Sequence, residues 1–235
     1  MTGDRSQQLA ANLARVRARI AAAVRAAGRN PAEVTLVAVT KTYPASDVVA
    51  LARLGVTEIG ENRDQEAAGK AAEVAARQVA VRWHYVGRLQ RNKCRSVVRY
   101  AEWVHSVDST RLATALGAAA AAHRDRPLEV LVQVSIDANP ARGGVAPDQL
   151  GRVAEAVAAE PALRLRGVMA VAPLAWSPAA AFERLAELAT RLRADHPQAT
   201  AVSAGMSEDL EEAVACGATH LRIGTDLLGT RAPLG

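Results

Sequence analysis

Apolar residues along this chain change their spacing at regular intervals, which predicts alternating strands and helices. From residue 34 onward, short runs rich in β-branched residues alternate with alanine-rich stretches such as 45–54 and 179–194. The runs that predict strands cover residues 34–40, 56–60, 82–86, 103–107, 129–136, 163–171, 200–203 and 220–223. Eight parallel βαβ units in about 200 residues predict one closed (β/α)8 barrel of the TIM type. We expect residues 1–235 to form a single domain.

Residues 1–30 predict an amphipathic helix that precedes the barrel. Apolar residues at three- and four-residue steps define one face: Leu9, Leu13, Val16, Ile20 and Val24. Gly28, followed by Asn30 and Pro31, ends the helix. Such a helix either binds nucleic acid or a membrane through its arginines, or caps a barrel end with its charges in solvent. We favour packing, because no aromatic residue in this segment is available to stack on bases.

The net charge of +5 resides in this N-terminal segment. Residues 1–30 hold six arginines against Asp4, and basic and acidic residues balance in the remainder. Cys94 and Cys216 are the only cysteines, which excludes a disulfide framework and argues against a structural metal site. No apolar run approaches the roughly 18 residues of a membrane span, and the arginines argue against a signal peptide. We expect a cytoplasmic protein.

Lysine is scarce, so each lysine is informative. Only Lys41, Lys70 and Lys93 occur among 29 basic residues. Lys41 ends the first predicted strand, and the carboxyl ends of barrel strands form the usual site of function. At such a position, partial desolvation lowers the pKa of an amine and prepares it for a Schiff base. The alternative is a lysine that extends into solvent.

The turns after the seventh and eighth predicted strands are candidates for a phosphate site. Gly205, Met206 and Ser207 form one turn, with Ser207 expected as the N-cap of a helix, and Gly224 and Thr225 form the other. Backbone N–H groups and hydroxyls at such turns bind phosphate, and barrels often place a phosphate there. Glycines also end many barrel strands for geometric reasons alone.

Arg222 lies inside the last predicted strand. It either pairs with a barrel carboxylate such as Glu61 or faces the ligand. If Lys41 holds a pyridoxal aldehyde, an arginine near the ring nitrogen would keep that nitrogen unprotonated, because two positive charges repel each other. Such a ring is a weak electron sink, and the site would be poorly suited to carbanion chemistry.

Several motifs, in order along residues 34–231, resemble the pyridoxal phosphate homeostasis protein family. They are LVAVTKTYP (36–44), GEN (60–62), WHYVGRLQRNK (83–93), RGVMA (166–170), SAGMSED (203–209) and RIGT (222–225). The resemblance implies a barrel like the N-terminal domain of alanine racemase, with pyridoxal 5'-phosphate (PLP) held as a Schiff base on Lys41. It implies that Asn62, Met206, Ser207, Gly224 and Thr225 surround the cofactor, the last four chiefly at its phosphate, and that Arg222 faces the pyridine nitrogen.

The family resemblance also implies a role in vitamin B6 balance without established turnover. One departure is Arg142, in the loop after the fifth strand, where relatives carry a lysine; an arginine cannot act as a second carrier amine.

A small PLP-dependent racemase or lyase is the alternative function. A racemase needs two bases, and we expect no second domain to supply one; Tyr43, Tyr85 and His84 are the nearest candidates, each equally consistent with packing. A cofactor-free Schiff-base aldolase and a nucleic-acid module are further hypotheses. PLP-dependent apo-enzymes are candidate partners, and we expect a monomer.

Overall fold

Eight parallel strands close into a barrel in which each strand pairs with its neighbours in sequence, and β8 pairs with β1. The computed structural model describes residues 2–139 and 141–229. The strands are β1 (Thr35–Val39), β2 (Glu58–Glu61), β3 (Arg82–Tyr85), β4 (Ala101–Val107), β5 (Leu128–Gln133), β6 (Leu163–Met169), β7 (Ala201–Ser203) and β8 (His220–Ile223). The predicted (β/α)8 barrel is confirmed, and each strand lies where the sequence pattern placed it.

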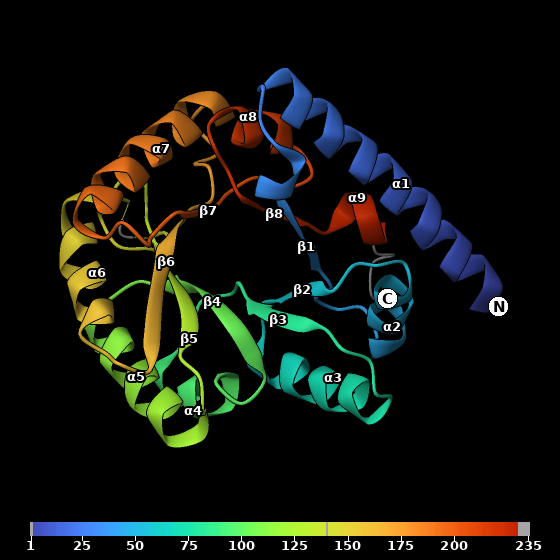
Figure 1. The fold of residues 1–235 in the computed structure, drawn as a ribbon, viewed down its shortest axis with the longest axis horizontal. Helices are drawn as coiled ribbons and strands as arrows, with labels where there is room; N and C mark the ends of the chain where they lie inside the picture. The colour runs from blue at the N-terminus through green and yellow to red at the C-terminus, as the bar shows by residue number, and fades with distance from the viewer. Residues whose placement is uncertain (1, 140, 230–235) are drawn as a thin grey trace.

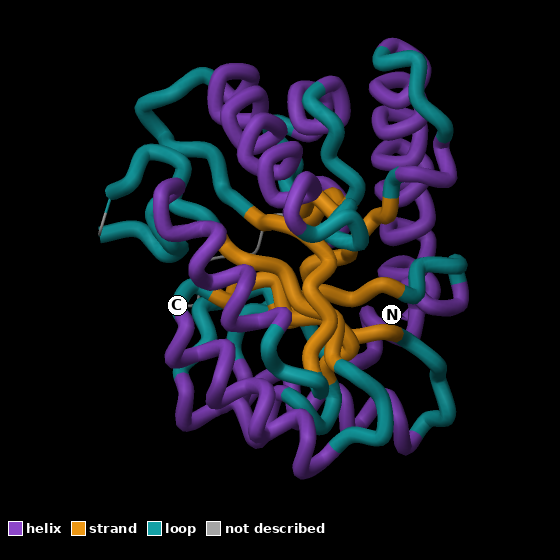
Figure 2. Tube along the Cα trace, turned by 60° about the vertical axis from the view of Figure 1, so that its left-hand side comes forward, coloured by secondary structure: helices purple, strands orange, loops and turns teal. Residues whose placement is uncertain are grey.

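Helices surround the strands, as Figures 1 and 2 show. They are α1 (Thr2–Ala26), α2 (Ala45–Arg53), α3 (Asp64–Ala76), α4 (Cys94–Val97), α5 (Thr110–His123), α6 (Leu150–Ala158), α7 (Pro178–Asp195), α8 (Leu210–Ala215) and α9 (Thr225–Leu228), with short 3-10 turns at Pro31–Glu33, Arg91–Lys93 and Pro147–Gln149. Within the described ranges, every helix is too short or too polar to cross a membrane.

The barrel has two apolar regions. The larger one lies between the sheet and the helices and includes residues of nearly every element. A small inner cluster of Trp103, Leu131, Met169 and Ala201 lies apart from it. Polar and charged side chains are buried as well, among them Glu61, His84, His105, Ser203 and Arg222.

Helix α1 occupies the outer layer, where a full-length helix after β8 would otherwise lie. Helix α9 has only four residues, and α1 packs against α8, α9 and α2 (Figure 1). The predicted apolar face is confirmed, because Leu9, Leu13, Val16 and Val24 are buried. The helix therefore closes the ring of helices instead of capping an end of the barrel.

Gly167 provides a sharp test of the barrel packing. Its φ is +148°, and a Cβ built on it would lie 1.8 Å from the carbonyl oxygen of Ala201 on β7. Gly167→Ala should destabilise the protein by about 3 kcal/mol or more, because backbone atoms of two paired strands would have to separate. Urea denaturation would measure the loss.

Gly69→Ala is the matched control for this prediction. Gly69 lies inside α3, and a Cβ there would meet nothing within 4 Å. Alanine should stabilise this helix by up to about 1 kcal/mol. Equal effects of the two substitutions would contradict the packing argument.

Candidate ligand site at the barrel mouth

Barrel closure brings the predicted site residues together at the carboxyl ends of the strands. Strand β1 pairs with β8 on one side, with Ala38 opposite Ile223, and with β2 on the other, with Val39 opposite Gly60. The residues that follow these strands therefore lie side by side: Lys41 after β1, Asn62 after β2, and Gly224 and Thr225 after β8.

Lys41 lies in a tight turn directly after β1. The N–H of Tyr43 donates to the carbonyl oxygen of Thr40 at 3.0 Å, which closes the turn, and the Lys41 side chain is exposed. Thr42 has a φ of +69°, a conformation that costs a β-branched residue about 1–3 kcal/mol. The surrounding protein must therefore hold this turn in place.

A buried ionic network holds the turn from below. The Lys70 ammonium donates to the Glu61 carboxylate at 2.5 Å, to the carbonyl oxygen of Thr40 at 2.7 Å and to Glu66 at 3.1 Å. Glu66 also accepts from the N–H of the strained Thr42, and Glu61 accepts from the Thr40 hydroxyl at 2.6 Å. Burial raises the pKa of Glu61, while Lys70 and Thr40 oppose this shift. These contacts attach the Lys41 turn to α3.

Asn62 follows β2 beside a cavity of about 580 Å³. Its amide oxygen is buried and lacks a hydrogen-bond partner among the described residues. Gly87 lies against it so closely that a Cβ would be 2.0 Å from the Asn62 carbonyl oxygen. The backbone at this corner is therefore fixed, and the Asn62 amide oxygen retains an unused acceptor.

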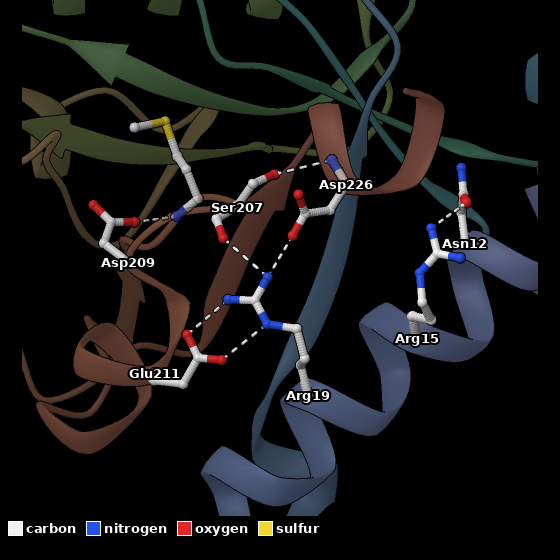
Figure 3. Close-up of polar contacts among 8 residues, drawn as sticks. Asn12, Arg15, Arg19, Ser207, Asp209, Glu211 and Asp226 are labelled. Atoms are coloured by element: carbon white, nitrogen blue, oxygen red, sulfur yellow. Dashed lines mark hydrogen bonds and ion pairs between the residues drawn. The ribbon is translucent and has the colours of Figure 1, made fainter. Parts of the chain in front are cut away.

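The turns after β7 and β8 are joined to each other (Figure 3). The Ser207 hydroxyl accepts from the Asp226 N–H at the start of α9, at 3.2 Å. Asp209 accepts from the Met206 N–H at 2.6 Å and is the N-cap residue of α8. The prediction that Ser207 is the N-cap of its own helix is therefore wrong, because the turn between the two residues moves the helix start to Leu210.

Unpaired backbone donors gather at these two turns. The N–H groups of Ser207, Glu208 and Thr225 find no acceptor in the described part of the chain. Successive N–H groups of this kind form an anion-binding concavity. Met206 and Thr225 are exposed, while Ser207 and Gly224 are half-buried. A phosphate group fits the donors that this corner presents.

Arg19 of α1 ties both turns to the N-terminal helix, as Figure 3 shows. Its guanidinium donates to the Ser207 carbonyl oxygen at 3.0 Å, to both Glu211 carboxylate oxygens at 2.8 and 2.9 Å, and to Asp226. The hydrogen bond to Glu211 contributes most to raising the pKa of Arg19. We expected the charges of this helix to lie in solvent, yet Arg19 supports the candidate phosphate corner.

Arg222 is 6% exposed and lies on the inner side of β8. It donates to the Ser203 hydroxyl at 2.7 Å and to the Ala170 carbonyl oxygen at 2.8 Å. Of the two alternatives for Arg222, pairing with Glu61 is wrong, because Glu61 is bound by Lys70 and Thr40. A guanidinium has five N–H donors, so Arg222 has others available to a ligand.

The other candidates have structural partners. The Tyr43 hydroxyl donates to the Gly229 carbonyl oxygen at 2.6 Å, and burial raises the pKa of Tyr85 to about 12. His84 is buried inside the barrel, hydrogen-bonded to His105 and Glu58. Arg142 pairs with Asp137 at 3.4 Å and donates to the Val171 carbonyl oxygen at 2.7 Å.

Sequence reasoning missed several residues that shape this site: Arg19, Glu66, Lys70, Ser203 and Asp209. Lys70 carried a usable signal, because it is one of three lysines and lies four residues after Glu66 on a predicted helix. The partners of Arg19 lie 188 to 207 residues away, so its role depends on the fold.

The fold and the site together define a class, that of the alanine racemase N-terminal domain. A sequence model of that domain matches residues 8–232. The alanine racemase of Corynebacterium glutamicum has the same fold, with a TM-score of 0.65 at 15% identity over 98% of this chain and 62% of that one.

Closer relatives define the family. The pyridoxal phosphate homeostasis protein of Mycobacterium tuberculosis strain H37Rv is 48% identical over 97% of this chain and 95% of its own length. That of Escherichia coli K12 is 39% identical over 95% and 97%. PipY of Synechococcus elongatus, whose structure was solved with PLP bound, gives a TM-score of 0.81 at 34% identity over 94% of this chain and 100% of that one. The chain belongs to the pyridoxal phosphate homeostasis protein family.

The Lys70 network leads to a prediction about stability. Lys70→Met would leave the buried Glu61 carboxylate without its counter-charge and should destabilise the protein by about 3–5 kcal/mol near neutral pH. Glu61 would then have a folded-state pKa further above its unfolded value. The loss should therefore be smaller at roughly pH 5, where the carboxyl can be protonated, than at roughly pH 8. Denaturation at both pH values would measure it.

Two variants serve as controls for this prediction. Adding Glu61→Gln to Lys70→Met removes the stranded charge and should recover part of the stability at pH 8. Lys93→Met removes a half-exposed lysine and should change stability by less than about 0.5 kcal/mol. A pH-independent loss in Lys70→Met would contradict the assignment.

Proposed function

We propose that this protein binds PLP at the barrel mouth, as a Schiff base on Lys41, and serves intracellular PLP homeostasis without catalytic turnover. The observation that carries the proposal is that one exposed lysine follows β1 beside its paired strand β8, which carries the buried Arg222 and leads into a corner of unpaired N–H groups. An amine, an anion site and a fixed donor are the three groups that an aldehyde, a phosphate and a pyridine nitrogen require.

Each residue has a separate role in this proposal. Lys41 supplies the amine, and the Lys70 network holds its turn. Ser207, Gly224, Thr225 and Met206 surround the phosphate, with the Ser207 hydroxyl and three unpaired N–H groups as donors. Asn62 lies beside the ring, where its amide oxygen can accept a hydrogen bond. Arg222 donates to the ring nitrogen and disfavours its protonation.

Racemisation or another proton transfer would require an acid or base beside the ligand. The Tyr43 and Tyr85 hydroxyls are engaged with backbone carbonyl oxygens, and His84 lies in the barrel interior. These contacts favour a carrier role over the racemase or lyase alternative. Exchange of an amino acid α-proton in deuterated water, well above the rate with free PLP, would reverse this preference.

We propose that this protein is a cytoplasmic monomer and that PLP-dependent apo-enzymes receive PLP from it. An apo-enzyme must reach the mouth to receive PLP, and exposed apolar side chains lie in the loops after β6 and β7 that border it. Val171, Leu174 and Trp176 follow β6, and Met206 follows β7. The two free cysteines suit a reducing compartment.

Lys41→Ala tests the carrier amine. The wild-type protein incubated with PLP should be yellow, and the substitution should abolish both the visible absorption and the covalent adduct trapped by borohydride. Lys93→Met should retain both signals. A colourless wild-type protein in excess PLP would exclude the proposal, and trapping with a sugar phosphate but not PLP would favour an aldolase.

Ser207→Ala tests the phosphate corner. Loss of a hydrogen bond to a charged group should weaken PLP binding about 10- to 100-fold. Binding of pyridoxal, which lacks the phosphate, should change by less than about threefold. Titration of both ligands would measure this difference, with Ser96→Ala on α4 as the control. Equal losses of affinity for PLP and pyridoxal would show that Ser207 does not bind the phosphate.

A further inference from the structure

A continuous chain of buried hydrogen bonds crosses the barrel interior from Arg222 to Glu58. Arg222 donates to the Ser203 hydroxyl at 2.7 Å, and Ser203 lies 2.9 Å from Nδ1 of His105. Nε2 of His105 lies 2.9 Å from Nδ1 of His84, and Nε2 of His84 lies 2.6 Å from the Glu58 carboxylate. The three middle residues are at most 1% exposed.

The two ends of this chain determine its direction. A guanidinium can only donate hydrogen bonds, and an ionised carboxylate can only accept them. The Ser203 hydroxyl accepts from Arg222 and keeps its own proton, which it donates to Nδ1 of a neutral His105. Each histidine then accepts at Nδ1 and donates from Nε2, with Glu58 as the last acceptor. Only neutral histidines in the Nε2–H form satisfy every link in this direction.

The electrostatics of the interior agree with this assignment. Burial lowers the pKa of His84 and, more strongly, that of His105. Burial also pushes the pKa of Glu58 up, but hydrogen bonds from His84 and Arg82 outweigh it and leave Glu58 below its ordinary value. Both histidines are thus neutral and Glu58 is charged.

We propose that Glu58, His84, His105 and Ser203 are positioning residues that hold Arg222 as a charged donor facing the barrel mouth. This inference rests on the proposed function, and it adds four residues that do not touch the ligand. Their role is to fix the side chain that keeps the ring nitrogen unprotonated. By holding Arg222 in place, this chain of hydrogen bonds favours ligands that have a hydrogen-bond acceptor at that ring position.

Proton transport along the same chain is a different function, and the charges disfavour it. Moving one proton along every link would leave a neutral Arg222 and a protonated Glu58. Burial lowers the pKa of Arg222 only to about 10, while Glu58 stays below its ordinary value. Arg222 therefore remains a much stronger base than Glu58, so the charged pair is favoured. This chain of hydrogen bonds therefore holds Arg222 in position and does not carry protons.

The direction of the chain can be tested on the protein without PLP. Long-range ¹H–¹⁵N spectra of ¹⁵N-histidine-labelled protein near pH 7 should show His84 and His105 neutral, each with its proton on Nε2. Spectra of His84→Gln and His105→Gln would assign the signals. A proton on Nδ1 of His105, or a charged His84, would overturn the proposed direction.

The link to the ring nitrogen is tested with a PLP analogue that carries CH in place of that nitrogen. The wild-type protein should prefer PLP over this analogue by about 10- to 100-fold, the value of a hydrogen bond from a charged donor. His105→Phe breaks the chain but keeps an aromatic ring, and it should reduce the preference to about threefold or less. Ser203→Ala removes one hydroxyl from the same chain and should do the same.

His220→Phe is the matched control. His220 belongs to the same aromatic cluster, with its ring centroid 6.1 Å from that of His105, but it bonds Thr219 and lies outside the chain. It should retain the wild-type preference. Equal losses of affinity for both ligands in His105→Phe and Ser203→Ala, with the preference intact, would show a merely structural role. Failure of the wild type to bind either ligand would instead refute the proposed function, while the histidine spectra would still decide the direction.

Discussion

Pairing of β8 with β1 is the constraint on which the site depends. It places the turn that carries Lys41 beside Gly224 and Thr225, more than 180 residues further along the chain. The same closure aligns the carboxyl ends of β2 and β7 around the mouth. A parallel barrel has no free edge, so these ends cannot shift independently. Lys41, the candidate phosphate corner and Arg222 are therefore held in one arrangement by the closed barrel.

This arrangement removes several charged side chains from water, and two separate networks of hydrogen bonds and ion pairs compensate for the lost hydration. One joins Lys70 to Glu61 and Glu66 beneath the Lys41 turn. The other runs from Arg222 to Glu58 through neutral groups. Removing one partner from a buried polar network is costly, so the site should be sensitive to single substitutions in either network. The first network holds the Lys41 turn in position, and the second holds Arg222, which we propose as the donor to the ring nitrogen.

Helix α1 connects the start of the chain to its last two turns. Its apolar face fills the layer that the short α9 leaves open, and Arg19 crosses to Ser207, Glu211 and Asp226. Asn12 adds a hydrogen bond to the Leu227 carbonyl oxygen at 2.9 Å. The helix that accounts for the net positive charge thus uses part of that charge in intramolecular ion pairs next to the candidate phosphate corner.

The sequence by itself determined the barrel, because strand and helix periodicities are local and each of the eight strands has its own apolar run. It also marked Lys41, through the scarcity of lysine, and the two glycine turns as candidate site residues, which the barrel brings to the same end of the strands. The sequence left undecided which partner Arg222 takes, which residue begins α8 and where Arg19 points. Those outcomes depend on contacts between residues distant in the chain, such as Arg222 with Ala170, and on competition among buried charges for few partners. Only barrel closure brings these residues into contact and so determines which partner each buried charge takes.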